Sequence, residues 1–288
     1  MAALKFALVS DIHIGAESEY EGAVRKLSRY SIPYLKDFVA KANEFEPAFV
    51  GQLGDMIEDG PGEGADAANY RQGLQVLAGC RAPVLHVLGN HEQVNLSAPA
   101  LCALAGLEKP YYEVSFDACT VLVLFSSSSR HTDIHVSSEQ IAWLEGALKR
   151  SEKPVLIFVH HPLDEQSLLG NVWFERYPDY CFVEERAELR RIFERSGKVC
   201  AVFGGHVHQN SASTINDIHY ITIQSLVERL PGANGSVGGT ADGSADGSAD
   251  DGIASGSYAL VNISGRELKV KVFGLDTFEK TLPLLCEF

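Results

Sequence analysis

Short apolar segments with strand character alternate with helical segments between residues 4 and 203, and this alternation limits the folds open to the chain. The segments with strand character are Leu4–Ser10, Ala48–Leu53, Val84–Leu88, Pro154–Val159 and Lys198–Phe203. The helical spacing of apolar residues between them predicts helices at Tyr20–Glu46, Tyr70–Leu77, Ala98–Ala105, Ser138–Lys149 and Glu184–Arg195. Pro33 is expected to kink or break the first of these helices. Such an alternation predicts an α/β fold, with stacked sheets inside and helices outside.

The last third of the chain carries strands without helices between them, as in a mixed β-sandwich. These strands are expected at His219–Leu226, Ser257–Ile263 and Glu267–Gly274. Residues 232–256 interrupt the run with a repeat of Ala-Asp-Gly-Ser and almost no apolar side chains, which predicts a flexible Gly/Ser/Ala/Asp-rich loop between two strands. We therefore expect one domain over residues 1–288 with this loop inserted in it.

The charge and composition of the chain limit the kinds of binding partner that we expect. The formal net charge is -14, whereas a protein that binds nucleic acid normally presents a basic surface, so we expect no nucleic-acid partner. No apolar stretch approaches the roughly 20 residues that span a bilayer, so we expect no membrane partner and a cytoplasmic location. The six cysteines form no Cys-x-x-Cys pair, and we interpret them as reduced, mostly buried thiols.

Five short polar motifs each follow a strand-like segment. They are Asp11-Ile12-His13, Gly54-Asp55, Gly89-Asn90-His91-Glu92, His160-His161 and Gly205-His206-Val207-His208. Because α/β sheets place their ligands at the carboxyl ends of strands, we expect these side chains to meet in one pocket. The expected metal ligands are Asp11, His13, Asp55, Asn90, His160, His206 and His208. Carboxylate, amide and imidazole donors suit two divalent ions such as Mn, Fe or Zn, and we expect Asp55 to bridge them.

In order and spacing, these motifs resemble the calcineurin-like metallophosphoesterase superfamily. The resemblance runs from Asp11 to His208 and implies a four-layer αββα sandwich, with two mixed β-sheets flanked by helices. It implies one metal site at Asp11, His13, Asp55 and His208, and a second at Asp55, Asn90, His160 and His206. It also implies that His91 contacts the phosphoryl oxygen or the leaving group, and that Glu92 orients His91.

Two subgroups of this superfamily share further residues with the chain. His160-His161-Pro162 and Gln140–Leu144 are similar to the class III cyclic-nucleotide phosphodiesterases. The segment Tyr34–Asp59 is similar to the manganese-dependent ADP-ribose/CDP-alcohol diphosphatases, although His13 stands where we expect Gln in that group. The subgroup therefore stays open.

The resemblance implies hydrolysis of a phosphodiester or diphosphate bond in a small, nucleotide-type substrate, by in-line attack of a hydroxide that bridges the two metal ions. A phosphomonoesterase, including a phosphoprotein phosphatase, is the alternative. A non-catalytic metal-binding scaffold is a lesser alternative, because all seven ligand positions are filled. Nothing in the sequence fixes the oligomeric state, and a dimer is one of the states left open.

The stretch 162–183 is rich in aromatic and polar residues, and we expect substrate contacts from it. The expected contacts are Asn171, Trp173 and Arg176, together with His161, which either supports a metal ligand or is a buried histidine with its own partners. The alternative is that Trp173 and Phe174 pack a surface loop or a dimer contact. Ser126–Ser129, with His131 just beyond, is interpreted as a polar loop.

Overall fold

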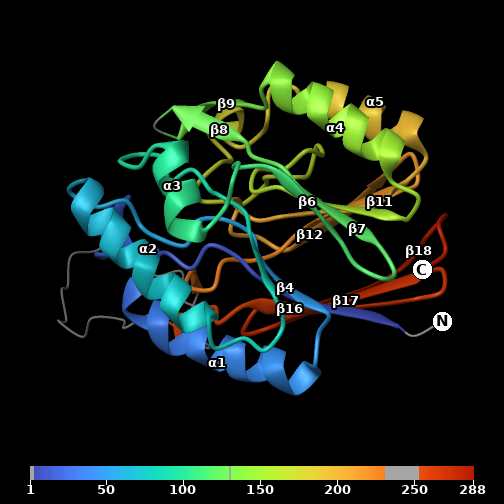
Figure 1. The fold of residues 1–288 in the computed structure, drawn as a ribbon. Coiled ribbons are helices and arrows are strands. Elements are labelled where there is room, and N and C mark those ends of the chain that lie inside the picture. Colours follow the sequence, from blue (N-terminus) through green and yellow to red (C-terminus); the bar gives the residue numbers. More distant parts are fainter. Residues whose placement is uncertain (1–2, 130, 231–252) are drawn as a thin grey trace.

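Two six-stranded mixed sheets stack face to face, and helices cover both outer faces (Figure 1). This computed structural model describes residues 3–129, 131–230 and 253–288. The arrangement confirms the predicted α/β class and the four αββα layers. It arises because each sheet is apolar on both faces, so each must be covered on both sides.

The first sheet has the strand order β18-β17-β16-β1-β4-β5. Its strands are β1 (Leu4–Val9), β4 (Phe49–Gln52), β5 (Val84–His86), β16 (Tyr258–Ser264), β17 (Glu267–Phe273) and β18 (Phe278–Pro283). Strands β1, β4 and β5 are parallel, and β16 extends the sheet antiparallel to β1. The carboxyl ends of β1, β4 and β5 therefore share one edge.

The second sheet has the order β12-β13-β11-β10-β7-β6. Its strands are β6 (Tyr112–Ser115), β7 (Thr120–Val123), β10 (Val155–Phe158), β11 (Val199–Gly204), β12 (Ser211–Ile215) and β13 (Ile218–Thr222). Strands β7, β10, β11 and β13 are parallel, with an antiparallel strand at each end of the sheet. The sequence patterns did not predict β12 or β18.

The core between the sheets centres on aromatic rings from both of them. Phe6 of β1 stacks on Phe49 of β4, with 4.9 Å between ring centroids, and meets the edge of Phe203 of β11 at 5.4 Å. Phe158 of β10 completes the group, and all four rings are fully buried. Apolar burial of this kind is the main favourable contribution to folding.

Helices α1 (Ser31–Phe45), α2 (Glu63–Leu77) and α3 (Ala98–Ala105) pack on the outer face of the first sheet. Helices α4 (Ser138–Arg150) and α5 (Arg186–Ser196) cover the second sheet. The Ser137 hydroxyl accepts the Gln140 backbone N–H at 3.2 Å and caps α4, as its sequence suggests. None of the described helices is both long and apolar enough to cross a bilayer.

The short elements lie mostly in loops. They are the 3₁₀ turns η1 (Ser28–Tyr30) and η2 (Pro178–Tyr180), and the strand pairs β2 (Glu19–Tyr20) with β3 (Ala23–Val24), β8 (Ser127–Ser129) with β9 (Thr132–His135), and β14 (Arg229–Leu230) with β15 (Ile253–Ala254). Of the expected loop 232–256, residues 232–252 lie outside the described residues. The single domain and the flexible loop stay predictions.

The predicted helix Tyr20–Glu46 is wrong in its first half. That half forms the β2–β3 hairpin and η1, and the helix α1 begins only at Ser31. Pro33 therefore lies in the first turn of α1, where a residue without an N–H removes no intrahelical hydrogen bond, and the proline neither kinks nor divides the helix.

The prediction of six reduced thiols is also wrong for one pair. Cys200 of β11 and Cys286 near the C-terminus form a disulfide, with their Cα atoms 6.6 Å apart. The other four cysteines are free. Eighty-six residues separate the pair in sequence, and only the folded chain brings the C-terminal segment beside β11.

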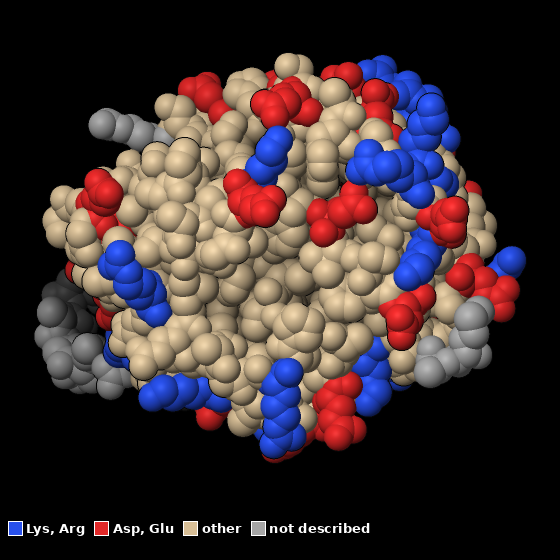
Figure 2. Space-filling view, in the orientation of Figure 1, with Lys and Arg blue, Asp and Glu red and all other residues tan. Residues whose placement is uncertain are grey.

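On the face of the molecule shown in Figure 2, lysine and arginine side chains are interspersed with acidic ones around the rim. Residues of other types fill most of the centre of that view. Surface charge of this kind carries no information about the fold.

Candidate active site

The five motifs meet where the carboxyl ends of the two sets of parallel strands face each other. In the first sheet, the loops after β1 and β4 stay paired, because the Asp11 N–H donates to the Gly54 carbonyl at 3.1 Å. In the second sheet, the Gly205 N–H donates to the His160 carbonyl at 3.0 Å. The convergence expected from the strand-end positions is therefore present in the fold.

Hydrogen bonds tie the two sheets together at this point. The backbone N–H of His206, after β11, donates to both carboxylate oxygens of Asp11, after β1, at 3.1 Å. Nδ1 of His160, after β10, lies 2.8 Å from the Leu53 carbonyl oxygen, after β4. Each sheet thus fixes the position of residues that the other sheet supplies.

The first group of donor atoms consists of Asp11, His13 and His208. Nε2 of His208 lies 3.0 Å from Nε2 of His13 and 3.3 Å from Oδ1 of Asp11. Nε2 of His13 lies 3.9 Å from the same Asp11 oxygen. Two ring nitrogens and a carboxylate oxygen facing one another in a fully buried space form a suitable site for a divalent cation.

The second group lies beside the first. Nε2 of His160 is 3.0 Å from Oδ1 of Asn90 and 3.2 Å from Oδ2 of Asp55. The ring of His206 packs against His160 with 5.1 Å between centroids. Asp55 clusters with His160 on one side and His13 on the other, which is the position that a bridging carboxylate requires.

All four ligand histidines of these two groups have their other ring nitrogen beside an oxygen acceptor. The pairs are His208 Nδ1 with Glu228 Oε2 at 2.6 Å, His13 Nδ1 with Glu58 Oε2 at 3.0 Å, His160 Nδ1 with the Leu53 oxygen at 2.8 Å, and His206 Nε2 with the Tyr180 oxygen at 3.1 Å. A partner at one ring nitrogen fixes the tautomer and leaves the other nitrogen free to bind a cation, as metal-binding histidines require. The residues present therefore fit two divalent cations.

The charges within the first group are strongly coupled. Burial alone would lower the pKa of His208, but the negative charges of Asp11 and Glu228 raise it to about 10. Burial alone would raise the pKa of Asp11, but the charge of His208 and its hydrogen bond lower it to about 2. The carboxylate is thus ionised, and a cation bound between the two groups would take the place of the histidine proton that this charge attracts.

Burial dominates at His13, where it combines with the charge of Lys26 to lower the pKa to about 3, so the ring is neutral at neutral pH. A neutral imidazole has the free lone pair that metal binding requires. The neighbouring Glu58 acts in the opposite direction but does not reverse the shift.

The backbone of the site is strained in an unusual number of places. Asp11, His13, Asp55, His206 and His208 all have φ between +50° and +68°, a region that non-glycine residues seldom adopt. Such strain persists only where the surrounding structure imposes it, and it concentrates at functional sites. The left-handed turns aim successive side chains into the same space.

The glycines of the motifs serve two different needs. Gly54 has φ +101°, as expected for a tight turn after a strand. Gly89 and Gly205 do not have positive φ. They are required for space, because a Cβ at Gly89 would overlap Asp55 and one at Gly205 would overlap Ser10 and Asp11.

A cavity of about 380 Å³ opens onto the ligand groups. Asp55, Asn90, His206 and His208 line its floor. Its walls are largely aromatic, and the rings belong to Tyr20, Trp173, Phe174, Tyr177 and Tyr180. Four of these five rings come from the stretch 162–183, where substrate contacts were expected.

His91 lines this cavity with its imidazole ring. Nδ1 of His91 lies 2.5 Å from Oδ1 of Asp59. Glu92 does not play the orienting role expected of it, because its two oxygens accept the backbone N–H groups of Met56 and Gly89, at 2.6 and 3.1 Å. Glu92 holds the loops after β4 and β5 together, and Asp59 orients His91.

The expected substrate contacts other than Trp173 lie away from the cavity walls. Asn171 is buried, and its side chain binds backbone groups of Val207, Trp173 and Phe174, so it shapes the loop. Arg176 pairs with Glu21 at 3.2 Å, and its side chain is 77% exposed. Neither residue lines this cavity, although both line a neighbouring one that shares Trp173 and His208 with it, and their contact with substrate stays a prediction.

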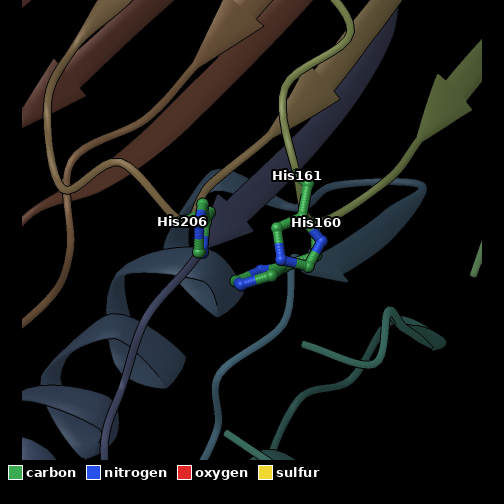
Figure 3. A group of neighbouring side chains, drawn as sticks. All are labelled: His160, His161 and His206. Carbon is green, nitrogen blue, oxygen red and sulfur yellow. The ribbon is translucent and has the colours of Figure 1, made fainter. Parts of the chain in front are cut away.

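His161 is fully buried beside His160 and His206, and the three rings gather at the ends of β10 and β11 (Figure 3). Its Nδ1 lies 2.6 Å from the Ser126 hydroxyl. Burial, together with the charges of His206 and His160, lowers the pKa of His161, so its ring is neutral. The residue packs behind the ligands and does not line the cavity.

Sequence reasoning missed three residues at the cavity. Lys26 follows the β2–β3 hairpin and lines the cavity, and Asp59 holds His91. His131, at the β8–β9 turn, places Nδ1 at 2.5 Å from the Asn90 amide nitrogen. An aspartate four residues after Gly54-Asp55 was a signal available in the sequence for Asp59, whereas Lys26 and His131 lie outside the motifs.

Comparisons with known proteins agree with this geometry. The chain is 28% identical over 204 residues to a glycerophosphodiester phosphodiesterase from Enterobacter lignolyticus, which covers 68% of this chain and 69% of that protein. It is 26% identical over 221 residues to a probable cyclic nucleotide phosphodiesterase from Fibrobacter succinogenes, covering 74% and 76%. The fold matches that of a dimetal phosphatase from Danio rerio with a TM-score of 0.73 at 19% identity, covering 97% and 98% of the two chains.

The sequence also matches the profile of a known protein family. The sequence profile of the calcineurin-like phosphoesterases matches residues 4–210, which contain all five motifs. That family consists of hydrolases that use a binuclear centre of divalent metal ions, and the ligand groups described above lie within the matched residues. The chain belongs to the calcineurin-like phosphoesterase family.

Proposed function

We propose that the chain hydrolyses a phosphodiester or diphosphate bond in a small, nucleotide-type substrate. The observation that carries this proposal is the aromatic-walled cavity of about 380 Å³ that opens onto the two ligand groups. A cavity of this size suits a small molecule, and tyrosine and tryptophan rings suit the flat face of a base. The two relatives named as phosphodiesterases support diester chemistry.

The roles of the residues follow from their positions. Asp11, His13 and His208 would hold one cation, Asn90, His160 and His206 the other, and Asp55 both. When bound, two such cations lower the pKa of bound water and offset charge on the phosphoryl group. His91, held at Nδ1 by Asp59, presents Nε2 to the cavity and is placed to donate to a phosphoryl oxygen or to the leaving oxygen.

A phosphomonoesterase is the alternative that one observation favours. Lys26 lines the cavity, and a monoester dianion carries one more negative charge for it to offset than a diester does. The narrow aromatic walls suit a small monoester better than a phosphoprotein. A metal-binding scaffold without activity is opposed by the hydrolase family to which the chain belongs and by the relatives named as phosphodiesterases.

A substrate panel tests the proposal. Mn²⁺-loaded and chelator-treated protein would be assayed with bis(4-nitrophenyl) phosphate, 4-nitrophenyl phosphate, a cyclic nucleotide, ADP-ribose and a CDP-alcohol. We expect metal-dependent turnover with a preference for diester or diphosphate substrates. A preference for the monoester would establish the alternative, and no turnover with any metal would favour the scaffold.

The same panel applied to His91→Ala tests the catalytic assignment. We expect unchanged metal content and a turnover that is about 10²- to 10⁴-fold lower, as for loss of a positioned proton donor. His135→Ala is the matched control, because His135 is a half-exposed histidine outside the cavity lining. Loss of metal in His91→Ala would reassign His91 as a ligand.

The choice among Mn, Fe and Zn, the cytoplasmic location, the lack of nucleic-acid and membrane partners, and a dimeric state stay predictions. Metal analysis of protein purified without added ions, together with its mass in solution, would test the first and the last of them.

A further inference from the structure

Lys26 lies in the wall of the cavity, although its side chain is only 10% exposed. Among the described residues that line this cavity, it is the one lysine or arginine. Its backbone is fixed, because Lys26 forms an antiparallel bridge with Glu228, and the next residue, Leu27, donates its N–H to the Val227 carbonyl at 2.9 Å. The segment after the β2–β3 hairpin thus places the positive charge of Lys26 at the cavity.

The ammonium group has two close polar partners. Nζ lies 2.6 Å from Oε2 of Glu58 and 3.2 Å from Nε2 of His91, and the ring of Trp173 lies 5.3 Å away and screens it from solvent. A lysine ammonium has three N–H donors, and the Glu58 carboxylate takes one of them, so donors remain for a ligand. Its nearest neighbour on the cavity side is His91, the residue placed to meet the phosphoryl group.

Lys26 shares its close carboxylate partner with the metal ligand His13. Among the described residues, Glu58 is the one carboxylate within ion-pair distance of Lys26, and the same Glu58 oxygen also lies 3.0 Å from Nδ1 of His13. A nearly buried cation is costly unless it is well paired. A phosphoryl oxygen in the cavity would supply a further acceptor and a further negative charge.

We infer that Lys26 is a further catalytic residue, whose ammonium group donates a hydrogen bond to a non-bridging phosphoryl oxygen of the bound substrate beside His91. This inference rests on the proposed function, because it assigns Lys26 to the same phosphoryl group. The bond is charge-assisted on both sides and gains strength as charge accumulates on the phosphoryl oxygens during attack. Loss of the ammonium is expected to lower kcat/KM by about 10- to 100-fold.

Two other roles for Lys26 make different predictions. A donor to the leaving oxygen would matter most when the leaving group is poor, so its loss would affect poor leaving groups more than good ones. A purely structural partner of Glu58 would act through His13, and its loss would lower metal content. A donor to a non-bridging oxygen affects good and poor leaving groups alike and also binds inorganic phosphate.

The test compares Lys26→Met with the wild type on ethyl 4-nitrophenyl phosphate and ethyl phenyl phosphate, which differ only in the leaving group. Lys41→Met is the matched control, because Lys41 also pairs with a glutamate but lies exposed on α1. We expect unchanged Mn²⁺ content, an equal fall of about 10- to 100-fold in kcat/KM on both esters, and at least about 10-fold weaker binding of inorganic phosphate by calorimetry.

Several results would overturn the inference. They are a fall confined to the phenyl ester, a loss of Mn²⁺, or unchanged phosphate binding. Lys26→Gln provides a second neutral variant if the methionine variant folds poorly, and it should lose phosphate affinity to a similar degree. A wild-type protein that turns over neither ester would contradict the proposed function, while phosphate calorimetry on the Mn²⁺-loaded protein would still decide the role of Lys26.

Discussion

Glu228 and His208 are joined by a contact of 2.6 Å between Oε2 and Nδ1, which leaves Nε2 of the histidine facing Asp11 and His13. The same carboxylate oxygen also accepts the indole N–H of Trp173 at 3.2 Å. Glu228 therefore links a metal ligand to the aromatic wall of the cavity, although it is neither a ligand nor part of a motif.

Glu228→Ala should weaken metal binding by about 10- to 100-fold, because loss of the carboxylate removes the restraint on the tautomer and orientation of His208. The measurement is activity as a function of free Mn²⁺ concentration. Glu279→Ala, a change at a surface glutamate on β18, serves as the control. An unshifted Mn²⁺ dependence in Glu228→Ala would show that the pair has no part in metal binding.

Asp59→Ala should lower turnover without loss of metal, since Asp59 contacts His91 and none of the seven ligands. The fall should be smaller than the 10²- to 10⁴-fold expected when the His91 ring itself is removed. Steady-state kinetics together with metal analysis provide the check. A variant with wild-type turnover would mean that the contact at 2.5 Å does not orient the ring during the reaction.

Phe158→Ala should destabilise the fold by about 3–5 kcal/mol, because it removes a fully buried ring from the core between the two sheets. Urea unfolding followed by circular dichroism measures the difference. Leu169→Ala, at a side chain that is 81% exposed, should change stability by less than about 0.5 kcal/mol. Equal effects of the two changes would be incompatible with the packing described here.

The surface pair of His135 and Glu185 should contribute a pH-dependent increment of stability. The hydrogen bond to Glu185, at 2.9 Å, raises the pKa of His135 above its ordinary value of 6.5. Because the folded pKa is higher than the unfolded one, the contribution is complete below pH 6.5 and is lost as the pH rises through the folded pKa.

His135→Ala should therefore destabilise the protein by about 0.2–1 kcal/mol at pH 5.5, a small value because the pair is half-exposed, and by less at pH 9. Urea unfolding of wild type and variant at both pH values gives the difference. A cost that grows from pH 5.5 to pH 9 would have the wrong sign for this pair.

The sequence predicted the convergence of the candidate ligands because each follows an apolar strand. Strands β1, β4, β10 and β11 were recognisable from composition, and parallel neighbours place their ends at one edge. The residues that support the ligands lack such a signal. Glu58 lies in a loop, Lys26 and Glu228 form an isolated β-bridge, and the contacts that give them roles join residues far apart in the chain.

The wrong predictions also arise from contacts between residues that local sequence patterns do not show. Apolar residues before Ser31 follow a helical spacing by chance, but they pack in a hairpin and a 3₁₀ turn beside the cavity, so tertiary contacts outweigh local pattern. Glu92 was assigned to His91 by proximity in sequence, whereas its carboxylate points to the backbone of Met56 and Gly89. The disulfide depends on where the C-terminal segment lies, which spacing does not show.

The central claim is that two divalent cations bind between the ends of the two sheets. Anomalous X-ray diffraction from crystals grown with Mn²⁺ tests it most directly. The account predicts two peaks roughly 3.5–4 Å apart, one beside Asp11 and His208, the other beside Asn90 and His160, with Asp55 between them. A map without peaks at these side chains, or with a single ion remote from Asp55, would contradict it.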